Sequence, residues 1–222
     1  MFFQWKNTEE PEHESDAPDK TGPARFWELI QGELATVMIV NLLFLATCIP
    51  IVTIPPALLS LHMVMRKIVL GSGVSCVRDY FGAFKQCWKR GYGAFFLTAL
   101  PMAAGAYGAA FYLRGASEYP VLLLPFALCT TAFWVTTLSS TYLYGLLCCG
   151  KLLRDAVKPA LLLGVAKPLR AVLAALCYYG TLLAAWLFFP LSGLYLFLIG
   201  FSFPCLLGNF YLRTVLKQYC GN

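Results

Sequence analysis

Side chains that could perform acid–base or metal chemistry are few in this sequence, and they do not cluster. The two histidines, His13 and His62, lie far apart, and there is no zinc-protease, serine-hydrolase or phosphate-loop motif. His62, Met63 and Met65 are copper ligands by type, but one histidine with two methionines on a helix is more typical of packing. We therefore expect a protein that is not an enzyme, with no catalytic residues, no cofactor and no metal site.

Uncharged polar side chains inside apolar segments are the second chemical feature. Asn41 and Asn209 lie within such segments, and Thr137 and Ser140 belong to a row of hydroxyl residues between 130 and 141. In a membrane these groups can hold helices together, or they can line a path for a neutral polar solute such as a sugar. Both interpretations stay open. No carboxylate lies at the centre of an apolar segment, which argues against a proton-driven pump.

The composition predicts the setting of these residues. Of 222 residues, 59% are hydrophobic and 13% are charged, and the mean hydropathy is +0.67. A soluble domain carries about 25% charged residues, so this chain belongs in a membrane. Residues 1–25 differ, with six acidic and three basic side chains and three prolines. We expect 1–25 to be a disordered acidic cytoplasmic tail and 26–222 to be the membrane domain.

Apolar runs set the number of expected spans, because a membrane helix needs about 20 mostly apolar residues. Prolines 50, 55 and 56 divide the first long run, and Pro190–Gly193 divides the last. Residues 51–70 could span fully or re-enter. The sequence predicts an all-α transmembrane bundle with about six spans, near residues 34–52, 55–70, 91–113, 119–149, 171–189 and 193–212.

The basic residues predict the orientation. With six spans, every Lys and Arg except Arg114 falls on one side, and such an excess marks the cytoplasmic face. We expect a multi-pass protein of the bacterial cytoplasmic membrane with both termini in the cytoplasm. Small residues four apart, Ala104 with Gly108 and Gly105 with Ala109, could pack inside the bundle or form a homo-oligomer.

Residues 75–90 predict an amphipathic elbow helix between two spans. Val77, Tyr80, Phe81, Phe84 and Trp88 recur at three- and four-residue steps. Basic residues on another face suit anionic lipid headgroups at the cytoplasmic face. The elbow could simply connect spans, or it could dock a partner. For docking or lipid contact we single out Lys85, Trp88, Lys89 and Arg90.

The order of motifs over residues 26–97 resembles the YesL-like family of bacterial integral membrane proteins, a family of unknown function. The resemblance rests on an Asn-Leu-Leu span, a proline-flanked turn and an Arg-Asp elbow. The residues at the motif positions are Asn41, Pro50, Thr53, Pro55, Arg78, Asp79, Phe81 and Phe84. By its hydroxyl chemistry, Thr53 is expected to cap the second span.

The resemblance implies an accessory, non-catalytic membrane protein associated with an ABC-type carbohydrate uptake system. Its partners would be the lipid bilayer and subunits of a sugar importer, and nucleic acid is not expected. The alternative is a facilitator or channel for a small polar solute, based on Asn41, Thr137, Ser140 and Asn209.

Overall fold

The computed structural model describes residues 23–116, 119–188 and 192–220. These residues form helices and no strand, which confirms the all-α prediction. Residues 1–22 of the expected tail lie outside the described residues, while residues 23–25 already belong to the first helix. The elements are α1 Pro23–Cys48, η1 Ile51–Thr53, α2 Ile54–Leu70, α3 Cys76–Gln86, α4 Trp88–Gly115, η2 Pro120–Leu122, α5 Leu123–Cys148, α6 Leu153–Ala166, α7 Pro168–Ala175, a π-helical segment η3 Leu176–Gly180, α8 Thr181–Leu187, α9 Gly193–Leu198 and α10 Ser202–Cys220.

Within the described residues, five helical stretches are long and apolar enough to cross a membrane. They are Leu29–Cys48, Ile51–Leu70, Trp88–Gly115, Pro120–Cys148 and Pro168–Leu187. Each overlaps one of the first five expected spans. Pro50 ends the first stretch, and Pro55 and Pro56 occupy the first turn of α2, where a missing backbone donor costs least.

The sixth expected span, residues 193–212, is not one helix, and this is a correction. It is divided at residues 199–201 into α9 and α10. A Cβ on Gly200 would clash with the backbone Cα of Leu196, so the turn is too tight for a side chain. Pro204 then sits in the first turn of α10, where proline begins a helix well and continues one poorly.

The side chain of Asn41 in α1 completes this break. Its Nδ2 donates to the carbonyl oxygens of Leu196 and Phe197 at 3.0 and 2.7 Å. Its Oδ1 accepts from the backbone amides of Phe201 and Ser202 at 3.0 and 3.1 Å. One amide thus satisfies the last carbonyls before the break and the first amides after it. Broken helices need such partners where water is absent.

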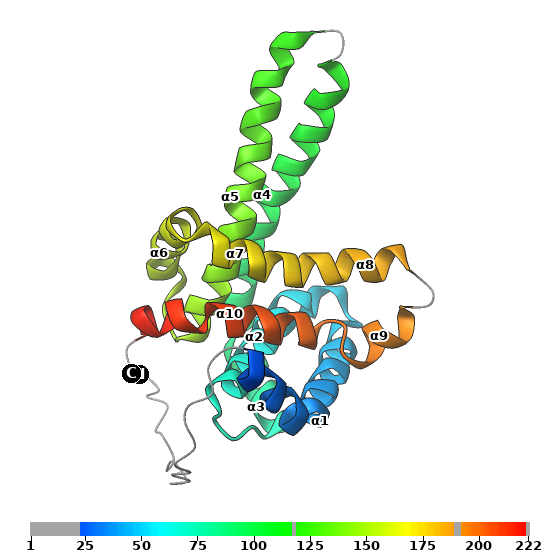
Figure 1. Ribbon diagram of the computed structural model, residues 1–222, viewed down its shortest axis with the longest axis vertical. Coiled ribbons are helices and arrows are strands. Elements are labelled where there is room, and N and C mark those ends of the chain that lie inside the picture. The colour runs from blue at the N-terminus through cyan, green and yellow to red at the C-terminus, as the bar shows by residue number, and fades with distance from the viewer. Residues whose placement is uncertain (1–22, 117–118, 189–191, 221–222) are drawn as a thin grey trace.

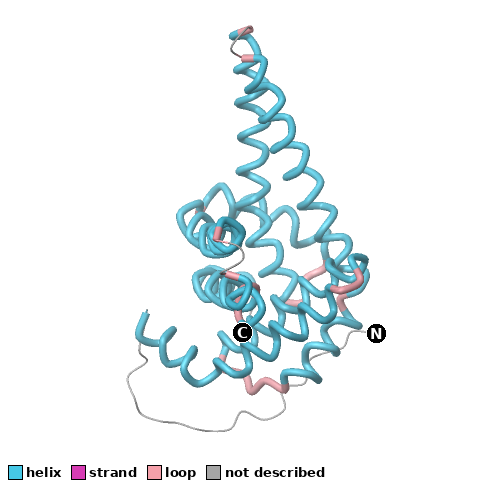
Figure 2. The backbone as a smooth tube through the Cα atoms, turned by 90° about the vertical axis from the view of Figure 1, so that its right-hand side faces the viewer, coloured by secondary structure: helices cyan, strands magenta, loops and turns pink. Residues whose placement is uncertain are grey.

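Helices α4 and α5 form a long hairpin that rises away from the other helices (Figures 1 and 2). Its outer half exposes large apolar side chains such as Tyr107, Phe111 and Leu124, as a lipid environment requires. The two helices approach closely at Gly105, where a Cβ would lie 3.0 Å from Cβ of Phe133. Gly105 therefore packs inside the chain, which is one of the two roles expected for it.

Helix α2 lies in the interior of the molecule. It has more buried residues than any other described helix. It meets α4 at Gly91, where a Cβ would lie 2.7 Å from the Pro56 Cα. Helix α6 meets α5 in the same way at Gly164, beside the backbone of Ser139. Helices α7 and α8 with η3 cross the base of the hairpin, and α10 runs below them in Figure 1.

Candidate functional site

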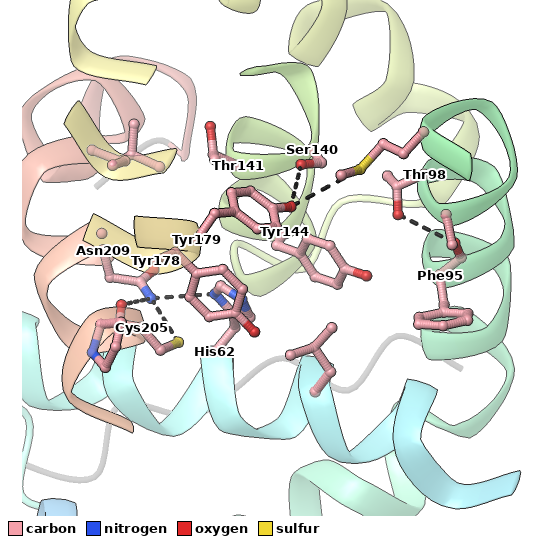
Figure 3. A pocket seen from close by; sticks show the side chains of 17 residues that line it. His62, Phe95, Thr98, Ser140, Thr141, Tyr144, Tyr178, Tyr179, Cys205 and Asn209 are labelled. Atoms are coloured by element: carbon pink, nitrogen blue, oxygen red, sulfur yellow. Dashed lines mark hydrogen bonds between the residues drawn. The ribbon is translucent and has the colours of Figure 1, made fainter. Parts of the chain in front are cut away.

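A cavity of about 330 Å³ lies where helices α2, α4, α5, α7, η3 and α10 meet. Figure 3 shows its side chains, which come from segments far apart in the sequence. The walls are mostly apolar, with polar groups from several helices set among them. The lining residues are Leu58, His62, Phe95, Thr98, Ala99, Met102, Ser140, Thr141, Tyr144, Ala174, Tyr178, Tyr179, Pro204, Cys205, Gly208, Asn209 and Leu212.

His62 and Asn209 form the polar end of this cavity. The Asn209 Nδ2 lies 3.4 Å from the His62 Nδ1 and donates to the Cys205 carbonyl at 2.9 Å. The imidazole stacks on the ring of Tyr144, with centroids 4.9 Å apart and planes 15° apart. The ring of Tyr178 also contacts it, with centroids 6.1 Å apart and planes tilted by 39°. The histidine is therefore held in one orientation by an amide and two aromatic rings (Figure 3).

The π-helical segment η3 explains why two consecutive tyrosines reach the same cavity. In an α-helix neighbouring side chains diverge by about 100°. The wider turn of Leu176–Gly180 reduces that angle, and both Tyr178 and Tyr179 line the cavity. The Tyr179 hydroxyl lies 3.5 Å from Ser140 Oγ and 4.0 Å from Met102 Sδ. Such π-turns are frequent at functional sites.

The oxygen of Asn209 is a buried acceptor without a donor. Asn209 is 3% exposed, and its Oδ1 has no hydrogen-bond partner among the described residues. The amide cannot simply be flipped, because Nδ2 is the atom that faces the Cys205 carbonyl. An unpaired buried carbonyl costs free energy. A hydrogen-bond donor that reached this oxygen would therefore be bound favourably.

Two of the four residues expected to form a polar path lie together at this cavity, and two do not. Ser140 and Asn209 line it. Asn41 is used entirely at the α9–α10 break, and Thr137 donates back to the carbonyl of Phe133 in its own helix at 2.8 Å. The same local bonding occupies most of the hydroxyl row, including Thr130, Thr131, Thr136 and Thr141. The row is therefore not a continuous polar track.

Residues 76–86 of the expected elbow form helix α3, which is anchored from within, whereas residues 88–90 belong to α4. Tyr80 is fully buried, and its hydroxyl lies 2.6 Å from the Thr47 Oγ1 of α1. Asp79 pairs with Lys67 of α2 at 3.3 Å and accepts from the Ser75 amide at 3.0 Å. These bonds hold α3 on the two helices behind it.

The outer face of this elbow carries aromatic and basic side chains together. Phe81 and Trp88 are 39% and 41% exposed, and Lys85 and Lys89 are exposed beside them. Arg90 is half-buried. A ladder of ring contacts at four-residue steps continues from α3 into α4, formed by Tyr80, Phe84, Trp88, Tyr92 and Phe96. The four residues expected to dock thus lie at the α3–α4 junction, and only Arg90 is partly covered.

The remaining motif residues have structural positions. Thr53 is the N-cap residue of α2, but its hydroxyl makes no capping bond. It donates instead to the carbonyls of Pro50, at 2.5 Å, and Thr47. The prediction that the Thr53 hydroxyl caps α2 by accepting from a backbone amide is therefore wrong. Pro55 lies against Gly91 of α4, and the exposed Arg78 lies 3.4 Å from Ser75 Oγ.

Sequence reasoning gave His62 a packing role and did not single out Tyr144, Tyr178 or Tyr179. The consecutive tyrosines in an apolar run were the available signal, because buried tyrosines require hydroxyl partners. Among the described residues, no group of three or more His, Cys, Asp or Glu side chains comes together to hold a metal ion.

Residues 37–107 match the model of a family described as "Protein of unknown function, DUF624". The matched segment covers about a third of the chain and includes the α1–α2 turn, the elbow and most of α4. It contains every residue of the expected motif. No curated protein and no solved structure matches the chain.

Proposed function

We propose that this protein is a YesL-like, non-catalytic accessory component of the bacterial cytoplasmic membrane that associates with an ABC-type carbohydrate importer. The five apolar helical stretches support the membrane role, and residues 37–107 are similar to a family of unknown function. The link to carbohydrate uptake comes from the YesL-like resemblance of residues 26–97.

The outer face of the elbow is the observation that carries this proposal. Phe81 and Lys85 are exposed on α3, which Tyr80 fixes in place, and Trp88 and Lys89 are exposed in the first turn of α4. A rigid helix with exposed rings and positive charge suits an acidic, partly apolar surface on a partner. Anionic lipid headgroups offer the same charge and would compete for it.

The proposed orientation places both termini and the elbow in the cytoplasm. It requires an even number of crossings, so α9 and α10 together would make the sixth. The rule of cytoplasmic positive charge supports this orientation. A fluorescent-protein fusion at the C-terminus should fluoresce, whereas an alkaline phosphatase fusion there should be inactive; the reverse pattern would contradict the orientation.

Affinity purification from native membranes in mild detergent tests the partner. We expect importer subunits to copurify with the wild-type protein, and the double variant Lys85→Glu, Lys89→Glu to lose them. Arg154→Glu is the matched control, because Arg154 is exposed in the first turn of α6 and lies outside the elbow. Equal recovery of importer subunits with all three folded proteins would rule out docking through the elbow.

A facilitator for a small polar solute is the second candidate. The convergence of Ser140 and Asn209 at one cavity favours it. Liposomes containing only this protein should then pass a sugar from a labelled panel, and Ala99→Leu, which fills the cavity from α4, should stop the flux. Absence of flux for the whole panel would remove this candidate without affecting the partner proposal.

A further inference from the structure

We infer that the cavity between α2, α4, α5, α7, η3 and α10 is a binding site for an uncharged, mainly apolar small molecule that carries a hydroxyl group. This inference does not depend on the proposed partner, because the cavity and the elbow face are formed by different side chains. It names a ligand chemistry that differs from that of a sugar.

The walls of the cavity select an apolar body. Leu58, Phe95, Met102, Pro204 and Leu212 line it, and no Asp, Glu, Lys or Arg does so in the described part of the chain. Moving an ion into such surroundings is costly because nothing would replace its water. A sugar would likewise leave most of its hydroxyls unpaired against these walls, so this inference and the sugar-facilitator candidate are alternatives for the same cavity.

The polar end selects one hydrogen-bond donor. Asn209 Oδ1 is buried without a partner, while Nδ2 is held by the Cys205 carbonyl and faces His62. Oδ1 is not itself open to the cavity, so the amide must rotate about its last side-chain torsion, which has a broad energy well, to meet a donor there. A ligand hydroxyl at this end would recover the hydrogen bond that the protein alone does not make.

The aromatic side chains select a flat ligand. The rings of Tyr144 and Tyr178 both contact the His62 imidazole, and Tyr179 adds a hydroxyl beside Ser140. Offset stacking on such rings contributes beyond the area buried. A volume of about 330 Å³ is at the lower end of the range for ligand pockets. A bicyclic aromatic alcohol therefore fits the size, shape and polarity of the cavity.

Three related probes test each part of this inference on the full-length protein in lipid nanodiscs. They are 2-naphthol, naphthalene, which lacks the donor, and 2-naphthalenesulfonate, which is charged. Binding is measured by fluorescence titration against empty nanodiscs. We expect saturable binding of 2-naphthol, about tenfold weaker binding of naphthalene, and none of the sulfonate. Equal binding of the three probes, or none above empty nanodiscs, would overturn the inference.

Two variants place the site. Asn209→Leu keeps the size of the side chain and should bring the affinity for 2-naphthol down to that for naphthalene. Ala99→Leu leaves every polar group in place and fills the cavity, so it should abolish 2-naphthol binding. It tests the site independently if Asn209→Leu does not fold. Lys85→Glu on the elbow is the control and should bind as the wild type does. Undiminished 2-naphthol binding by folded Ala99→Leu would place binding elsewhere and refute the site.

Discussion

The backbone amide of Phe201 donates to the side-chain oxygen of Asn41 over 3.0 Å, across 160 residues of chain. This bond belongs to a set of four through which one side chain joins α1 to both ends of the α9–α10 break. Asn41 is completely buried. In the sequence Asn41 was a candidate for lining a solute path. In the structure its side chain instead holds the two ends of the broken helix together.

Replacing this amide tests its structural role. Asn41→Leu keeps the shape but leaves two amides and two carbonyls at the break without a partner. We expect a loss of at least about 3 kcal/mol in the free energy of unfolding. Thr131→Val is the control, because Thr131 is exposed and bonds only its own helix, and it should change the value by less than about 0.5 kcal/mol. Denaturation in detergent gives both numbers, and equal stability of the two variants would contradict the role.

The crossing of α2 and α4 depends on the absence of a side chain at residue 91. In Gly91→Ala the new Cβ would lie 2.7 Å from the backbone of Pro56, which cannot move without shifting α2. We expect a loss of about 1–3 kcal/mol in stability. Gly82→Ala in α3 has no atom within 4 Å of the new Cβ and should add about 0.5–1 kcal/mol. Thermal unfolding of both variants should therefore shift in opposite directions, and a shared direction would disprove the close crossing.

The anchoring of the elbow depends on Asp79. Asp79→Ala removes one ion-pair partner of Lys67 and the acceptor for the Ser75 amide. We expect a loss of about 1–2 kcal/mol, and faster trypsin cleavage after the exposed Arg78. Asp155→Ala is the control, because Asp155 is exposed in the first turn of α6. If both variants are cleaved at the wild-type rate, α3 is held by other contacts.

Tyr80 should make the stability of the elbow sensitive to alkaline pH. Burial raises the pKa of the Tyr80 hydroxyl well above its usual value, although the bond to Thr47 opposes the shift. Below about pH 10 the hydroxyl is neutral in both the folded and unfolded states. Above that pH only the unfolded state ionises, so the folded state loses stability as the pH rises.

The variant Tyr80→Phe isolates this effect. At neutral pH it should be less stable than the wild type by about 1 kcal/mol, because the hydrogen bond to Thr47 is lost. Between about pH 9 and 11 that difference should shrink, since the variant has no hydroxyl to ionise there. Unfolding temperatures of both proteins across this range provide the measurement. A difference that stays constant with pH would show that Tyr80 does not control the alkaline response.

Apolar periodicity and proline positions predicted most of the helices. Uncharged runs between basic segments located the first five long helices, because a helix in lipid must bury every backbone donor and acceptor within itself. The break at Gly200 was missed. Glycine and proline are tolerated in membrane helices, so Gly200 and Pro204 alone could not show whether the helix would stop.

The elbow shows where sequence periodicity is incomplete. The stripe of Val77, Tyr80, Phe81, Phe84 and Trp88 predicted the helix but could not tell which side chains turn inward. In the structure Tyr80 is buried and Trp88 is not. The inward orientation of Tyr80 is stabilised by Thr47 of α1, whose hydroxyl forms a hydrogen bond with the tyrosine hydroxyl.

The sequence by itself determines local features of this protein. The helical segments, with their apolar character and lack of charge, follow from residues that are neighbours in the chain. The cavity was decided only by the tertiary structure. His62 and Asn209 are 147 residues apart, and their meeting depends on how α2 and α10 pack. Periodicity carries no information about such pairs, because many packings of the same helices bury the same apolar surface.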